Sequence, residues 1–369
     1  MSLKKALFVL HYSPPIHGAS KVGDMIINSS LISSELESKF LKIKGTQRLD
    51  EIGKFSLLKI KHSFKLFFGL ISKLFLFKPS IIYFTVSPQG FAFYRDLIIS
   101  IPIKIYCLFK TCSIYYHFHA KGIEEFASKS IISKTLTGLF LKNANLIFIS
   151  SQMQSEVNSI KGYKKIFFLN NGVNDNLDDS SFRNILKNKN KEINILYLSN
   201  MMKEKGYDTV LNLAKKTKFL NQKDIKFHFA GEWSSKSDEL YFKNFVEKHK
   251  LEEYVEYHGL VSGKDKFNLF VEAKAFIFPS KYKKEVFPLS VLEALSYGLP
   301  VIAFNAGAIS EIINKEIGVL TDENNLFEVF TIFKQEYLKD TVYIKCRNTF
   351  LEKYTIQKFE ENLLKILKS

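Results

Sequence analysis

Short apolar segments rich in β-branched and aromatic residues alternate along this chain with longer segments of helical periodicity. Such alternation is typical of strands joined by crossover helices in a parallel sheet. The expected strands fall into two series, separated by a polar stretch rich in Asn and Asp at residues 171–192. The first series is Ala6–Leu10, Ile81–Val86, Ile114–Phe118, Leu146–Ser150 and Ile166–Leu169, and the second is Ile193–Leu198, Ile225–Ala230, Val255–His258, Ala275–Phe278, Val301–Phe304 and Gly318–Leu320. We therefore expect an α/β protein with two αβα domains.

The length of 369 residues is enough for two domains with substantial cores. We predict an N-terminal domain at residues 1–170, a linker at 171–192 and a C-terminal domain at 193–350. A final helix at 351–369 is expected to pack back on the N-terminal domain. Ligands of such folds bind at the carboxyl ends of strands, and here we expect them between the two domains.

The positive charge is concentrated in the first half of the chain. The formal net charge is +16, with 53 Lys and Arg against 37 Asp and Glu. Residues 1–170 contain 23 basic and 9 acidic residues, whereas residues 171–369 contain 30 and 28. This distribution favours an anionic partner such as nucleic acid, a membrane surface or a phosphorylated substrate. Only four of the basic residues are Arg, and no nucleic-acid-binding motif is present, so we do not expect nucleic acid as the partner.

The cysteines and the apolar runs indicate a cellular compartment. The three cysteines have no CxxC spacing and are too few for a disulfide framework, which favours a reduced cytosol. The apolar run near the start is too short for a signal peptide. No apolar run of membrane-spanning length occurs, because lysines interrupt the best candidates. We expect a cytoplasmic protein.

The segment Lys54–Lys78 combines many Phe and Leu residues with a basic stripe at helical spacing. One interpretation is a core helix whose basic stripe faces solvent. The other is a helix that lies on an anionic membrane surface, to which its lysines are attracted. The breadth of the apolar face keeps the second interpretation open. Peripheral contact with the inner face of the cytoplasmic membrane is therefore one of our hypotheses.

The segment Ala275–Ile313 carries the clearest chemical signal. An apolar strand ends at Pro279, a loop carries Glu285, and a helix that begins near Ser290 carries Glu293. Two carboxylates in this arrangement can face one crevice and accept hydrogen bonds from hydroxyls of a single ligand. The free N–H groups at the start of the helix also suit a pyrophosphate. Alternatively, Ser290 and Glu293 form a capping box, in which the glutamate only stabilises the helix.

This segment closely resembles the signature of the family 4 retaining glycosyltransferases, which have the two-domain GT-B fold. The shared elements are a Pro-Ser pair, two glutamates with seven residues between them, a Gly-x-Pro-Val motif at 298–301 and a Gly-x-x-x-Glu motif at 307–311. The resemblance implies two Rossmann-like domains whose parallel sheets face each other across a cleft. It extends to bacterial transferases that build surface polysaccharides.

The resemblance implies roles for both glutamates. In that family the first glutamate contacts hydroxyls of the donor sugar, which here would be Glu285, and the second holds the ribose, which would be Glu293. The stretch that lines the sugar and the phosphates would comprise Val286, Phe287, Pro288 and Leu289.

A second part of the implied donor site lies at 197–208, in the sequence YLSNMMKEKGYD. It resembles the family's Lys-Gly-x-Asp element, whose lysine binds the diphosphate, and Lys205 would be that cation. Many family members have an Arg five residues before this lysine, where this chain has Asn200. It stays open which group replaces the positive charge of that Arg at the phosphates. Other matches imply donor contacts by Gly231, Glu232 and Val261.

The resemblance also implies site residues in the first domain. Gly18 lies in a loop, PPIHGAS at 14–20, that resembles the family's phosphate-approaching glycine loop, and it is not a P-loop because no Gly-Lys-Ser/Thr follows. Strand alternation places His117 and His119 on one side, and His119 aligns better with a family histidine that bonds the donor sugar. A metal held by this histidine pair is not expected, because no third ligand has suitable spacing. The acceptor-side residues would be Ser87, Gln89 and Arg95.

Together these matches imply a retaining transferase that moves a hexose or N-acetylhexosamine from a nucleotide sugar to a hydroxyl of a glycan or lipid-linked acceptor. A UDP-sugar is favoured over GDP-mannose, and the product would belong to lipopolysaccharide, O-antigen or capsule. The catalytic residues would be His119, Lys205 and Glu285, and no metal or other cofactor is expected. A GT-B sugar-nucleotide epimerase and a non-catalytic protein that binds anionic membranes or nucleic acid remain alternatives. A nicotinamide enzyme is disfavoured, because no G-x-G-x-x-G follows the first strand.

Overall fold

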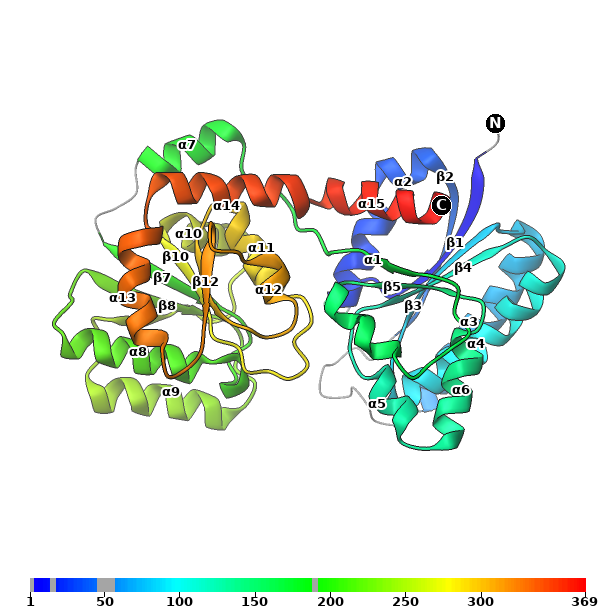
Figure 1. The fold of residues 1–369 in the computed structure, drawn as a ribbon, viewed down its shortest axis with the longest axis horizontal. Coiled ribbons are helices and arrows are strands. Elements are labelled where there is room, and N and C mark those ends of the chain that lie inside the picture. Colours follow the sequence, from blue (N-terminus) through cyan, green and yellow to red (C-terminus); the bar gives the residue numbers. More distant parts are fainter. Residues whose placement is uncertain (1–2, 14–17, 45–56, 188–191) are drawn as a thin grey trace. The chain divides into compact units, whose positions relative to one another are not determined.

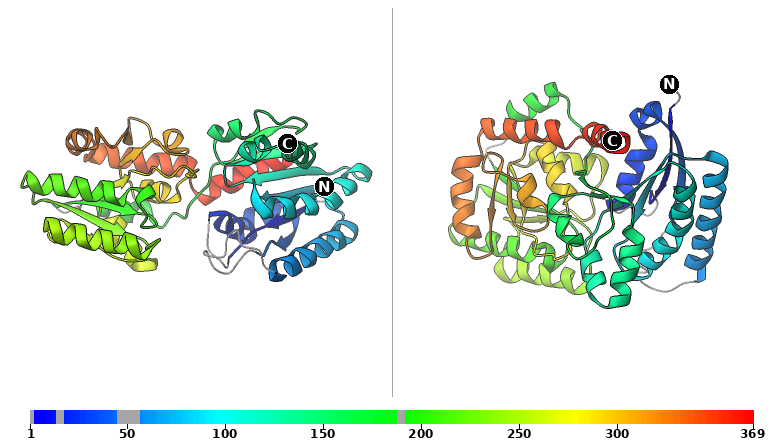
Figure 2. Two further views of the ribbon diagram at one scale, coloured as in Figure 1. Left: turned by 90° about the horizontal axis from the view of Figure 1, so that it is seen from below. Right: turned by 45° about the vertical axis from the view of Figure 1, so that its right-hand side comes forward.

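The computed structural model describes residues 3–13, 18–44, 57–187 and 192–369. The chain divides into two compact units. Unit 1 comprises residues 1–171 and 357–369, and unit 2 comprises residues 172–356. In each unit, helices cover both faces of one parallel sheet (Figures 1 and 2). The expected α/β, GT-B class of fold is confirmed by this architecture and by the structural similarities reported below.

Unit 1 has six parallel strands within its described residues, in the order β2-β1-β3-β4-β5-β6. The strands are β1 (Lys4–Leu10), β2 (Leu36–Lys42), β3 (Ile81–Val86), β4 (Ser113–Phe118), β5 (Asn145–Phe148) and β6 (Ile166–Phe168). The helices of its main segment are α1 (Gly18–Asn28), α2 (Ser30–Glu35), α3 (Leu57–Phe77), α4 (Gly90–Phe109), α5 (Ile123–Ser128), α6 (Ile131–Leu141) and the 3-10 helix η2 (Ser151–Val157). Strand β3 is buried along its whole length, as expected for a parallel strand covered on both faces.

Unit 2 has six parallel strands in its described part, in the order β12-β11-β10-β7-β8-β9. The strands are β7 (Ile193–Leu198), β8 (Ile225–Ala230), β9 (Val255–Tyr257), β10 (Ala275–Phe278), β11 (Val301–Phe304) and β12 (Gly318–Thr321). The helices are α7 (Asp179–Lys187), the 3-10 helix η3 (Lys203–Lys205), α8 (Tyr207–Phe219), α9 (Lys236–His249), α10 (Gly263–Glu272), α11 (Leu289–Ser296), α12 (Ile309–Ile312), α13 (Leu326–Tyr337) and α14 (Asp340–Lys353). From β7 the chain adds β8 and then β9 on one side of the sheet. It then crosses back and adds β10, β11 and β12 on the other side of β7. This is the common strand order of dinucleotide-binding sheets.

The structure differs from the expected linker at 171–192. Unit 2 begins at Gly172, and the polar stretch contains helix α7. Phe182 of this helix is buried, and its ring lies beside Gly298 and under the guanidinium of Arg347. A single buried aromatic side chain in a sequence rich in Asn and Asp explains why composition alone indicated a linker.

Strand β2 was not among the expected strands. It is an edge strand, and only Leu36 of its residues is buried. Its sequence, LESKFLK, mixes charged and apolar residues because one side of an edge strand faces solvent. The position of β2 therefore depends on its pairing with β1 rather than on its own apolar character.

The end of the chain returns to unit 1. Instead of one helix at 351–369, the structure has α14 in unit 2 and then α15 (Ile356–Lys368), with residues 357–369 in unit 1. Five apolar side chains of α15 join the buried cluster that contains side chains of β1 and α1. They are Phe359, Leu363, Leu364, Ile366 and Leu367. None of the helices in the described ranges is long and apolar enough to cross a membrane.

Candidate active site

Two of the predicted catalytic residues follow neighbouring strands of unit 2. Lys205 ends helix η3, which follows β7, and Glu285 lies in the loop after β10. Strands β7 and β10 are paired, and the chain leaves β7 toward β8 on its other side. The strand order therefore reverses between them, and such a switch point binds ligands at the carboxyl ends of the strands.

Lys205 and Glu285 form an ion pair at this point. The Nζ atom of Lys205 donates a hydrogen bond to Oε2 of Glu285. Only 15% of the Lys205 side chain and 9% of the Glu285 side chain are exposed. Ser280 Oγ lies 3.4 Å from the same carboxylate oxygen, and Lys205 Nζ lies 4.8 Å from the centre of the Tyr282 ring. The site thus offers a sheltered cation beside a sheltered acceptor.

Gly206 makes this approach of the two loops sterically allowed. Its φ is +90°, in the left-handed region, and a Cβ there would lie 2.2 Å from the carbonyl oxygen of Pro279. The backbone N–H of Lys281 also donates to the carbonyl of Glu204 over 2.7 Å. The glycine of the Lys-Gly motif is therefore needed because the loop after β7 presses against the loop after β10.

Gly231 likewise allows the close approach of two loops, those after β7 and β8. A Cβ at this position would lie 1.8 Å from the carbonyl oxygen of Ser199. Backbone hydrogen bonds join the two loops, since Met201 N–H donates to Glu232 and Ser234 N–H donates to Met201, over 2.8 and 3.1 Å. The Gly-Glu match at 231–232 thus marks a packed turn next to the Lys205 loop.

Glu293 lies on helix α11 and does not cap it. The N-cap residue of α11 is Pro288, and no side chain caps this helix, so the capping-box interpretation of Ser290 and Glu293 is wrong. Glu293 instead accepts a hydrogen bond of 2.8 Å from Nζ of Lys266 on α10, and a fifth of its side chain is exposed. Its carboxylate can therefore be reached by a ligand.

The other predicted donor contacts also lie in unit 2. Asn200 and Glu232 are exposed, and Val261 is partly buried. Val286, Phe287 and Pro288 are buried, and Leu289 is the first residue of α11. The first N–H groups of any helix have no partner within the helix, so the start of α11 after Pro288 offers donors beside the Glu285 loop.

In unit 1, His117 and His119 lie together as strand alternation predicted. Their ring centroids are 4.1 Å apart. His117 is buried in β4 and is hydrogen bonded through Nδ1 to the Tyr83 hydroxyl. Burial, with a smaller effect of His119, lowers the pKa of His117 well below its usual value. His119 follows the strand and is only partly buried, so it is the more accessible of the two.

The predicted acceptor-side residues follow β3. The carboxylate of Asp96 is fully buried and accepts hydrogen bonds of 2.8 Å from the Ser87 N–H and from Nε of Arg95. Burial raises the pKa of Asp96, and Arg95 and Ser87 partly oppose this effect. The side chain of Gln89 lies against Gly122, where a Cβ would come within 2.7 Å of its Nε2 atom. The loops after β3 and β4 are therefore packed together.

Gly18 is the first residue of α1, and a Cβ there would meet no atom of the described residues within 4 Å. The rest of the predicted glycine loop, residues 14–17, lies outside the described residues. Residues 54–56 of the predicted membrane helix also lie outside them, and helix α3 begins at Leu57.

The sequence prediction missed two contacts of the site. Tyr282 lies in the loop after β10, close to Lys205. Its contact with Lys205 follows once the loops after β7 and β10 are known to meet. Lys266 lies 27 residues before Glu293 on another helix, and no local pattern connects them. Only the packing of α10 and α11 brings this lysine to the carboxylate.

The part of the chain that holds these residues matches a known protein family. Residues 178–329 match the family described as glycosyl transferases group 1. This range contains Lys205, Glu285 and Glu293, and it covers most of unit 2.

Two curated relatives share parts of the sequence. The chain is 32% identical over 143 residues to an uncharacterised 41.2 kDa protein in the cps region of Klebsiella pneumoniae, which covers 38% of this chain and 36% of that protein. It is 35% identical over 81 residues to an O-antigen chain mannosyltransferase B of Escherichia coli, which covers 22% and 20% of the two chains. The chain thus spans about a third or less of the length of these relatives.

Solved structures are similar over nearly the whole chain. A glycosyltransferase of Rickettsia africae has a TM-score of 0.73 at 16% identity, with 100% of this chain and 98% of that chain covered. The Anabaena protein Alr3699/HepE in complex with UDP has a TM-score of 0.69 at 14% identity, with 99% of both chains covered. At such identities the likeness establishes the fold. The chain therefore has the GT-B fold, and residues 178–329 match the glycosyl transferases group 1 family.

Proposed function

We propose that this protein is a retaining glycosyltransferase that acts in the biosynthesis of a surface polysaccharide. It would move a hexose or N-acetylhexosamine from a nucleotide sugar to a hydroxyl of a glycan or lipid-linked acceptor. The observation that carries the proposal is the sheltered Lys205–Glu285 pair at the switch point of a group 1 domain. The O-antigen and cps relatives support the polysaccharide context.

Donor binding would exchange the partners of this ion pair. A diphosphate is a stronger anionic partner than one carboxylate, so Lys205 would turn to the phosphates. Glu285 would then accept hydrogen bonds from hydroxyls of the sugar. In the transition state, negative charge grows on the departing phosphate, and Lys205 together with the N-terminus of α11 would stabilise it.

We favour front-face attack by the acceptor hydroxyl, with its proton taken by the leaving phosphate. His119 would bond the donor sugar, and Ser87, Gln89 and Arg95 would contact the acceptor side. We expect no metal requirement for the transfer step, because Lys205 and the helix N-terminus would supply the positive charge. Turnover with and without added Mg²⁺ should differ by less than twofold, and a strict dependence on Mg²⁺ would contradict this part of the proposal.

A UDP-sugar is the donor that we favour, with GDP-mannose second. The similar Anabaena structure holds UDP, which supports this choice at the level of the fold. Glu293 would hold the ribose after displacing Lys266. A thermal-shift screen with UDP-, GDP- and ADP-sugars tests the choice, because a bound donor stabilises the folded protein by mass action. Stabilisation by GDP-mannose alone would overturn the preference for UDP.

Two variants test the site itself. Glu285→Gln and Lys205→Met should each reduce transfer at least about tenfold, equivalent to about 1.4 kcal/mol. The matched controls are Glu316→Gln and Lys345→Met, which break an exposed ion pair between the same residue types. Unchanged transfer in both site variants would reject the assignment. Isomerised nucleotide sugar without transfer would indicate the epimerase, and neither turnover nor donor-induced stabilisation would indicate a non-catalytic protein.

We also propose peripheral contact of helix α3 with an anionic membrane. Its Leu66, Leu70 and Leu74 are buried, whereas Phe68 and Leu76 are 64% and 81% exposed. Exposed lysines lie on the same helix, and the neighbouring helix α4 exposes further large apolar side chains. Apolar side chains flanked by lysines suit a negatively charged lipid surface.

Vesicles of phosphatidylglycerol and phosphatidylcholine test this contact. The protein should co-sediment with them at low salt and release at high salt, where the Debye length falls from about 10 Å to a few Å. Absence of binding at low salt would remove the membrane proposal and leave the transferase proposal intact.

A further inference from the structure

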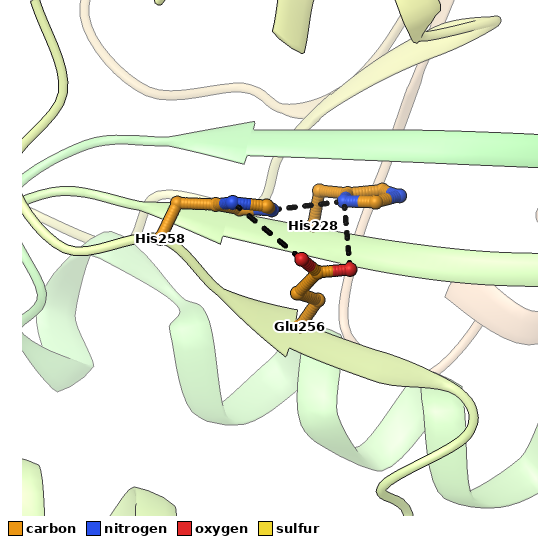
Figure 3. Close-up of side chains that lie close together, drawn as sticks. All are labelled: His228, Glu256 and His258. Atoms are coloured by element: carbon orange, nitrogen blue, oxygen red, sulfur yellow. Dashed lines mark hydrogen bonds and ion pairs between the residues drawn. The ribbon is translucent and has the colours of Figure 1, made fainter. Parts of the chain in front are cut away.

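Three side chains on the edge of the sheet in unit 2 converge away from the Lys205–Glu285 pair. They are His228 on β8, Glu256 on β9 and His258, which follows β9 (Figure 3). His228 and Glu256 are directly paired across the two strands, and His258 lies two residues beyond Glu256. Alternation along a strand therefore places all three on one face of the sheet.

The ligand-type atoms of this cluster lie within 4.8 Å of one another. His228 Nδ1 is 2.9 Å from His258 Nε2, and it is 3.9 Å from the nearer carboxylate oxygen of Glu256. His258 Nδ1 is 3.8 Å from the other oxygen of that carboxylate. These separations are close to those between ligand atoms that share one metal ion with bonds of about 2.0–2.2 Å.

The far nitrogen of His228 is oriented by a neighbour. His228 Nε2 is 3.1 Å from Oδ1 of Asn194, a buried residue of β7. A hydrogen on Nε2 satisfies this oxygen, which leaves Nδ1 with a lone pair that points into the cluster. Metal-binding histidines commonly have such a partner on the nitrogen that does not bind the metal.

We propose that His228, Glu256 and His258 bind a divalent transition-metal ion of the zinc class. The ion would take the lone pair of His228 Nδ1, that of His258 Nε2 and one oxygen of Glu256. The hydrogen that His258 Nε2 donates to His228 in the metal-free cluster would then be on Nδ1 of the same ring, so the imidazole stays neutral. Two imidazoles and one carboxylate suit zinc, copper or nickel, whereas magnesium and calcium prefer sites made of oxygen atoms.

The ion would have a structural role. Strand β9 has three residues and lies at the edge of the sheet, next to β8 only. The cluster links these two strands, and His258 leads into the segment that contains Val261, a predicted donor contact. A metal there would fix the edge strand and the start of that segment, while the transfer chemistry stays with Lys205 and Glu285.

Zinc titration of the untagged protein tests this site. We expect wild-type protein to bind one equivalent of Zn²⁺ in calorimetry and to melt at a higher temperature when it is bound. His258→Ala and Glu256→Gln should each weaken this binding at least tenfold. His258 is only partly buried and Glu256 is exposed, so both variants are expected to fold. His249→Ala, on helix α9, is the matched control and should bind like wild type.

Lys226 provides a variant with the opposite expected effect. Its Nζ atom lies 2.5 Å from Oε2 of Glu256 and competes with a cation for that oxygen. Lys226→Met should therefore strengthen Zn²⁺ binding several-fold. The proposal is overturned if wild type binds no stoichiometric Zn²⁺, or if binding persists unchanged in both His258→Ala and Glu256→Gln. Neither result would affect the proposed transferase activity, which is measured separately with Glu285→Gln.

Discussion

The two units use their charged residues in different ways. Unit 1 contains most of the excess positive charge, and its lysines lie mainly on the surface, several of them near exposed Phe side chains of α3. Unit 2 is nearly neutral and places charges in sheltered pairs such as Lys205–Glu285 and Arg347–Asp175, and unit 1 also has a sheltered pair in Arg95–Asp96. Net charge therefore points to the surface that we propose meets an anionic partner, and it does not locate the Lys205–Glu285 site.

The buried guanidinium of Arg347 is expected to show the largest effect. It donates to both carboxylate oxygens of Asp175 and to the carbonyls of Ser296 and Leu177, each over 2.7 Å. Arg347→Met should cost unit 2 about 3–5 kcal/mol, because it leaves a carboxylate and buried carbonyls without their donor.

Trp233 is the only tryptophan of the chain and packs, partly buried, against the core of unit 2, so its fluorescence during urea unfolding reports on that unit. Arg183→Met, which removes an exposed Arg of α7, is the control and should leave the midpoint unchanged. An unchanged midpoint in Arg347→Met would show that this buried ion pair does not hold unit 2 together.

A core residue of α15 tests unit 1 in turn. Leu363 is fully buried beside β1, and Leu363→Ala should cost about 2–5 kcal/mol through lost apolar contact and a residual cavity. The loss should appear as an early phase in far-UV circular dichroism, while the Trp233 midpoint stays in place. Lys365→Ala, on the exposed side of the same helix, is the control. A shift of the Trp233 midpoint in Leu363→Ala would mean that the two units unfold together.

Gly206→Ala tests whether the packed loops of unit 2 are needed for its chemistry. A side chain at a φ of +90° costs about 1–3 kcal/mol in strain, and the close carbonyl of Pro279 would have to move away. Transfer should fall at least tenfold, because the Lys205 loop would separate from the Glu285 loop. In Gly138→Ala, on helix α6, the new Cβ meets nothing within 4 Å, and we expect wild-type transfer. Full activity in Gly206→Ala would show that the loop contact is dispensable.

The smallest effect on stability is expected at the surface of unit 1. Phe68→Ser combined with Leu76→Ser should change the free energy of unfolding by less than about 0.5 kcal/mol, because both side chains are largely exposed. Vesicle binding should nevertheless drop several-fold. Equal loss of binding in Phe219→Ser, an exposed Phe of unit 2, would mean that α3 is not the membrane surface.

The sequence predicted the buried strands well because they are short apolar runs between turns. Four strands of unit 2, Ile193–Leu198, Ile225–Ala230, Ala275–Phe278 and Val301–Phe304, begin and end at the expected residues. Strand β2 escaped prediction because an edge strand can carry charges. Helix α7 carries an apolar helical spacing in Phe182, Ile185 and Leu186, but the surrounding Asn- and Asp-rich composition indicated a linker.

The site could be predicted only where the signature fixed it. Glu285 and Lys205 were named from motifs, but their contact depends on the pairing of β7 with β10 and on the close approach at Gly206. The hydrogen bond between Lys266 and Glu293 depends on how helices α10 and α11 pack, which the local sequence does not indicate. The His228–Glu256–His258 cluster depends on strand register, since a shift of one residue would turn Glu256 to the other face.

Helix α15 has a consequence for how the chain folds during synthesis. Residues 172–356 form unit 2 as one continuous stretch, so this unit can fold as soon as it leaves the ribosome. Residues 1–171 of unit 1 are synthesised before unit 2, yet part of the core of unit 1 is made of residues 357–369, which follow unit 2 in the chain. The apolar surface around β1 therefore stays uncovered by α15 until residues 357–369 have been synthesised. The half of the protein that is made earliest should be the last to become resistant to proteolysis.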